Sequence, residues 1–197
     1  MVKPKVKLSD VAKLTTSPAA IIGEHLKLDL GCGDRKAEGY LGIDKFKTDA
    51  TDYTFDLLEF PWPVADGSVA AIHCSHFFEH IPARLRPKFM DECYRVMEDK
   101  GQLVIIVPHY NSMRAIQDYT HEWPPISESS FLYFNLGWRT QNKLLHGAYE
   151  MKCDFDFGYG YSLDPDVQVR NQEYQQVAIK HYTNAAMDLH VTMTARK

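Results

Sequence analysis

The chain has 197 residues, a length that suits one domain with a sizeable core. Hydrophobic residues make up 45% of it and the formal net charge is -4, as in an ordinary globular protein without the strongly basic surface of a dedicated nucleic-acid binder. The longest apolar run, Leu103 to Val107, is far too short to span a bilayer, so neither nucleic acid nor a membrane is an expected partner.

The N-terminal residues and the cysteines indicate the compartment. Residues 1–25 carry three early lysines with no apolar stretch after them, which predicts a surface arm, with a short helix near Ser9 to Leu14, and no signal peptide. The cysteines are far apart and form no C-x-x-C pair, which is typical of reduced thiols in a cytoplasmic protein. They are Cys32, Cys74, Cys93 and Cys153.

The segment Leu26 to Asp44 reads LKLDLGCGDRKAEGYLGID and is the most informative stretch. Leu28 to Leu30 predict a short buried strand, and Gly31-Cys32-Gly33 predicts a glycine turn at its carboxyl end, where open α/β sheets bind ligands. A second apolar run, Tyr40 to Ile43, ends in Asp44. A carboxylate at that strand tip can accept both ribose hydroxyls of a nucleoside.

A dinucleotide-binding fold is the main rival, and the spacing disfavours it. Its fingerprint is G-x-G-x-x-G with an acid about 20 residues further on. Here Lys36 occupies the third glycine position and Asp44 comes too early. A tight turn without a ligand is the plain alternative. From Gly31 to Gly39 there is room for barely one helical turn, so we expect an abbreviated first crossover between parallel strands.

Further elements follow in chain order. After Asp44 comes a polar segment, then Phe55-Asp56-Leu57-Leu58, and the loop PWPVADGS then precedes a predicted strand at Val69 to Cys74. A turn leads into a helix holding Phe77, Phe78 and Ile81, and apolar spacing predicts the next helix. In the C-terminal half, helical segments alternate with two late strands that would form an antiparallel hairpin closing the sheet. The predicted segments are strand Val69 to Cys74, helix Lys88 to Met97 stopped by Lys100-Gly101, strand Gln102 to Val107 ended by Pro108, helix Ser127 to Phe134, strand Met151 to Tyr161, helix Gln172 to Tyr182 and strand Asp188 to Thr194.

The glycine-turn segment and the helix–Gly–strand stretch before Pro108 resemble class I methyltransferases that use S-adenosylmethionine (SAM), in particular small type 11-like enzymes, over residues 26 to about 110. The resemblance implies a Rossmann-like α/β fold. It also implies a mixed seven-stranded sheet with helices on both faces, whose last strand inserts beside the fifth. Residues 26–197 would then form a single SAM-binding domain.

The resemblance also implies a set of cofactor contacts. The glycine turn and the second strand tip would hold the methionine and ribose parts of SAM, and the segment after the third strand would hold the adenine. The end of the fourth strand would approach the sulfonium. The residues implied are Asp29, Leu30, Gly31, Cys32, Gly33, Asp44, Lys45, Asp56, Leu57, Ser75 and His76.

The run His76-Phe77-Phe78-Glu79-His80 has two interpretations. It fits H-x-x-E-H, in which His76 and His80 would bind zinc and Glu79 would act as general base of a hydrolase. It also resembles the turn after the fourth strand of class I methyltransferases. We favour the second interpretation and expect no metal, because it also accounts for the glycine turn upstream, the preceding strand and the following helix.

The loop after the fifth strand supplies the acceptor-side candidates. The segment Asp118-Tyr119-Thr120-His121 resembles a D-x-T-H segment of several small methyltransferases. His109, Tyr110, Asp118 and His121 are therefore candidate acceptor-binding residues. His76, His109 and His121 are the candidate bases, since a neutral imidazole accepts a proton near pH 7. The expected acceptor is a small molecule, a sugar or glycan, or a protein side chain; a catalytically silent SAM-fold protein that binds a partner is the alternative.

Overall fold

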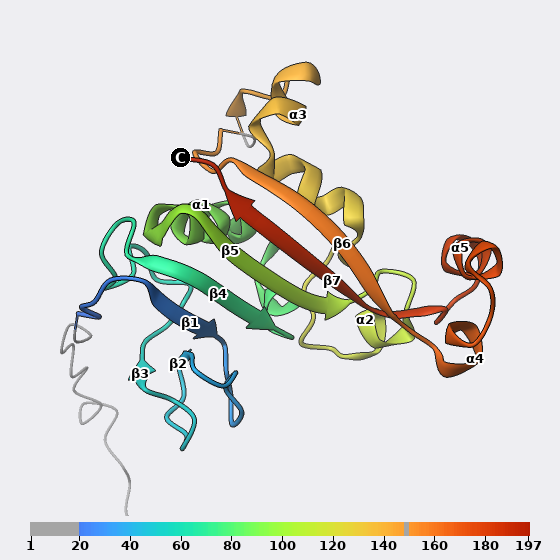
Figure 1. The fold of residues 1–197 in the computed structure, drawn as a ribbon, viewed down its shortest axis with the longest axis horizontal. Helices are drawn as coiled ribbons and strands as arrows, with labels where there is room; N and C mark the ends of the chain where they lie inside the picture. The colour runs from blue at the N-terminus through green and yellow to red at the C-terminus, as the bar shows by residue number, and fades with distance from the viewer. Residues whose placement is uncertain (1–19, 148–149) are drawn as a thin grey trace, which may run out of the picture.

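Seven strands form one open sheet in the computed structural model of the chain, which describes residues 20–147 and 150–197. They are β1 (Leu26–Leu30), β2 (Leu41–Asp44), β3 (Tyr53–Thr54), β4 (Val69–Ser75), β5 (Met97–Pro108), β6 (Phe155–Leu163) and β7 (Ala186–Ala195). Their order is β3-β2-β1-β4-β5-β7-β6, and only β7 runs antiparallel to its neighbours (Figure 1). The predicted mixed seven-stranded sheet, with the last strand beside the fifth, is confirmed.

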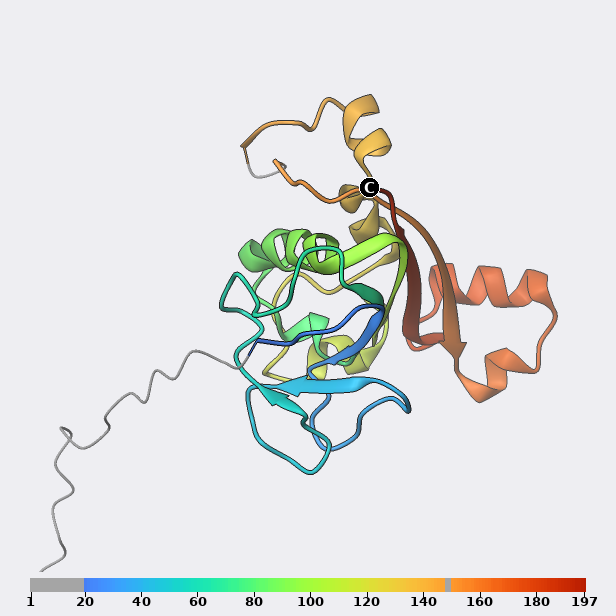
Figure 2. The same ribbon diagram turned by 60° about the vertical axis from the view of Figure 1, so that its left-hand side comes forward.

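Short helices and helical turns accompany the sheet. They are η2 (Phe78–His80), η3 (Ala83–Leu85), α1 (Arg86–Val96), α2 (Met113–Gln117), η4 (Glu128–Phe134), α3 (Leu136–Gln141), α4 (Pro165–Gln168) and α5 (Gln172–His181). Figure 2 shows α1 on one side of β5, β7 and β6, and α5 on the other. No helix within residues 20–147 and 150–197 combines the length and the apolar composition that crossing a bilayer requires.

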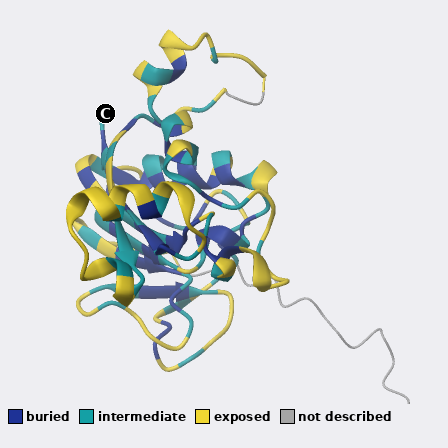
Figure 3. Cartoon of the chain, turned by 90° about the vertical axis from the view of Figure 1, so that its right-hand side faces the viewer, coloured by how far each residue is buried: buried dark blue, intermediate teal, exposed yellow. Residues whose placement is uncertain are grey.

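An aromatic cluster ties the helical layer to the sheet. The ring of Phe78 in η2 lies 5.8 Å from that of Phe89 in α1 and 6.0 Å from that of Phe131 in η4. All three side chains are almost completely buried. Figure 3 shows the buried residues gathered in the strands and in the adjoining sides of the helices. Burial of this aromatic surface supplies much of the hydrophobic stabilisation between η2, α1 and η4.

The first crossover contains no helix, as its length predicts. The amide of Ala37 donates to Asp29 Oδ2 at 2.6 Å, and the amide of Arg35 donates to the Cys32 carbonyl at 3.0 Å. On β2, a Cβ added at Gly42 would lie 2.3 Å from the Ala50 carbonyl oxygen. The backbone of β2 is therefore packed closely against the segment that follows it.

Several predicted boundaries differ from the observed ones. The helix before β5 ends at Val96 rather than at Lys100-Gly101, because residues 98–101 form a bulge in β5: Val69 pairs with Met97, and Ala71 with Gln102. The helix expected around Phe77 to Ile81 is the single turn η2. The expected short helix near Ser9 to Leu14 lies outside the described residues.

Two further boundaries differ from expectation, and backbone hydrogen bonds to other segments explain both. β6 begins at Phe155 rather than Met151, because its partner β7 ends at Ala195, which is opposite Phe155. Ile21, expected in a surface arm, is 2% exposed and its amide donates to the Pro63 carbonyl at 2.7 Å. The packed part of the chain therefore already includes residue 21.

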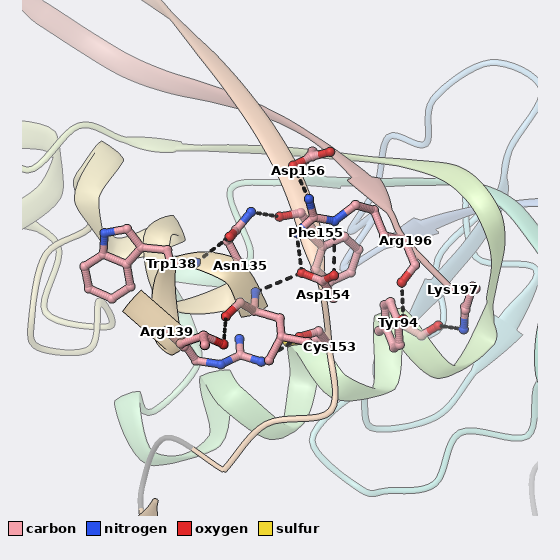
Figure 4. Close-up of polar contacts among 12 residues, drawn as sticks. Tyr94, Asn135, Trp138, Arg139, Cys153, Asp154, Phe155, Asp156, Arg196 and Lys197 are labelled. Carbon is pink, nitrogen blue, oxygen red and sulfur yellow. Dashed lines mark hydrogen bonds and ion pairs between the residues drawn. The ribbon is translucent and has the colours of Figure 1, made fainter. Parts of the chain in front are cut away.

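The segment between η4 and β6 is held by buried polar contacts (Figure 4). Arg139 of α3 is fully buried and its guanidinium donates to the carbonyls of Tyr133, Met151 and Cys153 at 2.7, 3.3 and 2.9 Å. Asn135 accepts from the Trp138 amide at 2.8 Å and so caps α3. These contacts lie away from the carboxyl ends of β1 and β2, where the candidate site is found.

Candidate active site

The glycine turn packs directly against the turn that follows β4. Gly31 and Gly33 have φ values of +68° and +55°, a left-handed conformation that glycine adopts without steric penalty. A Cβ added at Gly31 would lie 2.4 Å from the ring of Phe77, whereas one added at Gly33 would meet nothing within 4 Å. Position 31 therefore favours glycine for two reasons: the left-handed backbone and the close approach of the Phe77 ring.

A cavity of about 410 Å³ opens beside this turn, at the carboxyl ends of β1, β2, β3 and β4. This is the edge where open α/β sheets bind ligands, and the volume falls in the usual range of ligand pockets. Six of the expected cofactor contacts line it: Gly31, Asp44, Lys45, Asp56, Leu57 and His76. Sequence reasoning missed five further lining residues, which are Phe46, Leu58, Phe77, His80 and Thr120.

The two carboxylates of the cavity are held by backbone amides. Asp44 accepts from the amides of Gly33 at 3.0 Å and Phe46 at 2.9 Å, one on each oxygen. Asp56 accepts from the Leu58 amide at 2.8 Å. Each ionised carboxylate has about four acceptor sites, so both can still accept from a ligand. The residues present therefore fit a nucleoside, with Asp44 for ribose hydroxyls and Asp56 beside apolar Leu57 for an adenine.

The other expected cofactor contacts lie behind the cavity wall. Asp29 is buried, and its carboxylate bonds the Ala37 amide and lies 2.8 Å from His73 Nδ1, so it holds the crossover loop. Burial raises the pKa of the Cys32 thiol, which points toward the Ala50 carbonyl. Leu30, Cys32, Gly33 and Ser75 are likewise not among the residues that line the cavity.

His76, Glu79 and His80 lie in the turn after β4, and His121 packs against His80. His76 has a φ of +52°, a strained conformation for a residue other than glycine. Its Nδ1 lies 3.4 Å from Glu79 Oε1, and this carboxylate raises the pKa of His76. The rings of His80 and His121 are 4.8 Å apart between centroids and cross at 71°. The structure thus brings together His121 and both histidines of the H-x-x-E-H run.

The side chains of Asp118 and His121, both candidate acceptor-binding residues, are not hydrogen-bonded to each other. The Asp118 carboxylate bonds the amide and hydroxyl of Thr120 at 2.9 and 2.7 Å, and lies 3.8 Å from His121 Nε2, beyond hydrogen-bond distance. The Ala115 carbonyl lies 3.2 Å from His121 Nδ1 and is its hydrogen-bond partner. The pKa of Asp118 is lowered by its hydrogen bonds to Thr120.

His109 and Tyr110 belong to a different cavity. His109 is 1% exposed, and its Nε2 lies 3.1 Å from Glu128 Oε1, which also accepts from the Tyr161 hydroxyl. Together with Tyr159 and residues of α5, these side chains line a cavity of about 430 Å³. Burial opposes ionisation of Glu128, but the hydrogen bonds from His109 and Tyr161 outweigh it and lower its pKa from 4.5 to about 2.

This low pKa predicts an acid-sensitive contribution to stability. A carboxylate whose pKa is lowered by folding stabilises the protein above its unfolded pKa and loses that effect as the pH falls toward its folded pKa. We expect wild type to lose free energy of unfolding between pH 4.5 and about 2. Glu128→Gln should be less stable at pH 7 and lose less over that window. Urea unfolding at each pH measures this, with exposed Glu24→Gln as control; equal acid sensitivity in all three proteins would contradict it.

Arg86 is a residue of the site that the sequence did not reveal. It is 8% exposed, and its guanidinium donates to the carbonyls of Ile81, Glu122 and Pro124 at 3.0, 2.9 and 2.8 Å. The loop that carries His121 is thereby fastened to the turn after β4. The PARLRP segment contains no pattern that identifies carbonyl acceptors 36 and 38 residues away.

Comparisons with known proteins agree with this geometry. A family model described as a methyltransferase domain matches residues 28–105. A search of curated proteins finds no match. A SAM-dependent methyltransferase from Archaeoglobus fulgidus is similar in structure, with 16% identity, a TM-score of 0.55 and coverage of 87% of this chain and 86% of that one. A chain of the complex between the Haloferax volcanii Trm112 methyltransferase activator and a methyltransferase is also similar in structure. It has 14% identity and a TM-score of 0.54, and the match covers 91% of this chain and 86% of that one.

RNA methyltransferases share the architecture as well. A 16S rRNA (adenine(1408)-N(1))-methyltransferase from Catenulisporales acidiphilia has 11% identity, a TM-score of 0.50 and coverage of 89% of this chain and 87% of that one. Similarity at these identities shows the fold and leaves the methyl acceptor open. The chain therefore has the fold of SAM-dependent methyltransferases, and its residues 28–105 match the model of a methyltransferase domain.

Proposed function

We propose that the chain transfers the methyl group of SAM to a small, ring-bearing acceptor without phosphate. The observation that carries this proposal is the cavity of about 410 Å³ in which Gly31 and Asp44 face His76 and His80. Asp44 would bind the ribose hydroxyls, and Asp56 with Leu57 would hold the adenine. SAM supplies a methyl group already activated on a positively charged sulfur. The protein then has to align the acceptor and accept its proton.

The acceptor would enter from the loop after β5. Side chains of this loop line a further cavity of about 550 Å³, whose described lining includes no Lys or Arg. Trp123 and Ile116, both of which line it, are 77% and 57% exposed, and Glu128 contributes a carboxylate. Exposed aromatic surface suits stacking against a ring, whereas a phosphate-bearing acceptor would meet only negative charge. This lining supports a small molecule or sugar over a nucleic acid.

Three imidazoles are candidate acceptors of the proton. His76 lines the cofactor cavity, and His121 lies against His80, which also lines it. His109 is bonded to Glu128 and lines the separate cavity beside β6, which makes it the weakest candidate. Each of the three stays a proposal for the base.

The ribose contact gives a direct test. Asp44→Ala should weaken SAM binding at least about tenfold, or ~1.4 kcal/mol, because it removes the carboxylate at the strand tip. Titration calorimetry with SAM measures this, and Asp49→Ala is the matched control, since Asp49 is exposed and does not line the cavity. Equal affinity of both variants and wild type would remove the assigned contact.

A turnover assay separates an enzyme from a silent SAM-fold binding protein. Wild type is incubated with methyl-labelled SAM and pooled small molecules and sugars. Label should enter an acceptor, and Asp44→Ala should transfer at least about tenfold less at a limiting SAM concentration. Tight SAM binding with no transfer to any pool, RNA or protein included, would favour the silent protein.

A further inference from the structure

We propose that Glu79, His80 and His121 form a binding site for a divalent transition-metal ion at the acceptor side of the cofactor cavity. One ligand atom from each residue lies within 4.8 Å of the other two. His80 lines the cavity together with Gly31 and Asp44. The sequence led us to expect no metal here, but that expectation considered only His76 and His80 as paired ligands. The fold brings His121 to this place instead.

Glu79 is the first reason. Its side chain is 5% exposed, and neither carboxylate oxygen has a hydrogen-bond partner among residues 20–147 and 150–197. His76 Nδ1, at 3.4 Å, is near enough for ionic attraction but lacks hydrogen-bond geometry. A buried carboxylate without donors is costly, whereas coordination to a cation satisfies it. An ion bound between Glu79 and the two imidazoles of His80 and His121 would give the carboxylate oxygens the partner that no hydrogen bond from the described part of the chain supplies.

The tautomers of the two histidines are the second reason. His80 Nδ1 lies 3.2 Å from the Thr120 carbonyl, and His121 Nδ1 lies 3.2 Å from the Ala115 carbonyl. A carbonyl can only accept, so each Nδ1 carries the proton and each Nε2 keeps its lone pair. Backbone carbonyls fix metal-binding histidines in this way in many proteins.

The third reason is that the turn carrying Glu79 and His80 is hydrogen-bonded to the loop carrying His121. The Glu122 amide, next to His121, donates to the Glu79 carbonyl at 2.9 Å. Arg86 adds its bonds to the Glu122 and Pro124 carbonyls. With bonds to the ion of ~2.1 Å, ligand atoms would lie roughly 3–3.5 Å apart. The ligand atoms, which lie within 4.8 Å of one another, would therefore have to move closer together around the ion.

The ligand set determines the class of ion and of acceptor. Two imidazoles and one carboxylate suit manganese, iron, cobalt or zinc better than magnesium, which prefers oxygen ligands. Three protein ligands leave coordination positions open toward the cavity. If the chain acts as proposed above, an acceptor hydroxyl would bind there and release its proton to water. Its oxygen then bonds to the methyl carbon as the carbon–sulfur bond breaks, and the sulfur keeps the bonding pair.

Metal binding can be measured without an acceptor. Full-length protein treated with EDTA and dialysed is titrated with MnCl2, CoCl2, ZnCl2 and MgCl2 by calorimetry, and Mn²⁺ binding is checked by electron paramagnetic resonance. We expect one Mn²⁺, Co²⁺ or Zn²⁺ per chain and at least tenfold weaker binding of Mg²⁺. Glu79→Gln and His121→Ala should each weaken the transition-metal affinity by roughly 100-fold.

Two control variants define which histidines bind the ion. His181→Ala removes an exposed histidine of α5 and should leave affinity unchanged. His76→Gln should also keep it within about threefold. Affinity lost in His76→Gln but kept in His121→Ala would assign the ion to the H-x-x-E-H pair and overturn our ligand set. Equal affinity of Glu79→Gln, His121→Ala and wild type would overturn the site.

Thermal unfolding shows whether each variant is folded. In EDTA, Glu79→Gln should unfold at the same temperature as wild type or higher, because it removes an unpartnered buried charge. Adding Mn²⁺ at a concentration that saturates wild type should raise the unfolding temperature of wild type but not that of Glu79→Gln. SAM titrations on the same metal-free protein keep the two proposals apart. SAM binding without metal binding refutes this site alone, and metal binding without SAM binding refutes only the proposed function.

Discussion

Gly31→Ala should reduce SAM affinity by at least 100-fold, the largest effect of a single methyl group that we expect in this protein. The added Cβ would lie 2.4 Å from the ring of Phe77. Phe77 itself lines the cofactor cavity, so the ring can relieve the clash only by moving within it. The left-handed backbone at residue 31, with φ +68°, adds about 1–2 kcal/mol of strain for alanine.

Gly39→Ala is the matched control for this prediction. Gly39 has a φ of +79° in the same crossover loop, but a Cβ there meets nothing within 4 Å. It should show the strain alone, with SAM affinity nearly unchanged in calorimetry and a smaller loss of stability in urea unfolding. Adding Phe77→Val to Gly31→Ala should restore part of the lost stability, since the two sites are in contact. Equal losses in both glycine variants would show that Phe77 does not set this wall.

The cofactor half of the site could be predicted because its signals are local. Strand, glycine turn and strand-tip acid follow one another within Leu26 to Asp44, and the carboxyl edge of a parallel sheet brings them together. The short crossover between β1 and β2 could also be predicted, since barely one helical turn fits between Gly31 and Gly39. Each of these inferences needs only chain length and backbone geometry.

The acceptor half could not be predicted because it depends on contacts between distant segments. His121 meets His80 across 41 positions of sequence, through a loop whose conformation is set by Arg86 and by carbonyl groups. Every residue has a backbone carbonyl, so the sequence does not show which carbonyls accept these hydrogen bonds. The Ala115 carbonyl, and not the nearby carboxylate of Asp118, is the hydrogen-bond partner of the His121 ring. The separation of His109 from the other histidines was hidden for the same reason.

Arg86→Met should lower methyl transfer by at least 100-fold while changing SAM affinity by less than about threefold. The methionine keeps the apolar stem but leaves the carbonyls of Ile81, Glu122 and Pro124 without their donor. We expect a loss of roughly 2–4 kcal/mol in the free energy of unfolding, because these carbonyls are covered by the protein. The loop with His121 and Trp123 would then lose its fixed position, so Arg86 acts as a positioning residue.

Arg139→Met separates positioning from stability. Arg139 is also buried and also donates to three carbonyls, those of Tyr133, Met151 and Cys153, but at α3, away from the cofactor cavity. It should lose a similar amount of stability and, under conditions where both variants are fully folded, keep normal turnover. Hydrogen exchange gives a readout that does not depend on activity: the Glu122 amide, bonded to the Glu79 carbonyl, should exchange faster only in Arg86→Met. Equal turnover in the two variants would mean that the guanidinium of Arg86 merely stabilises the fold. Slow turnover with fast exchange in Arg86→Met alone would show that the acceptor side of the proposed site depends on one buried side chain for its geometry.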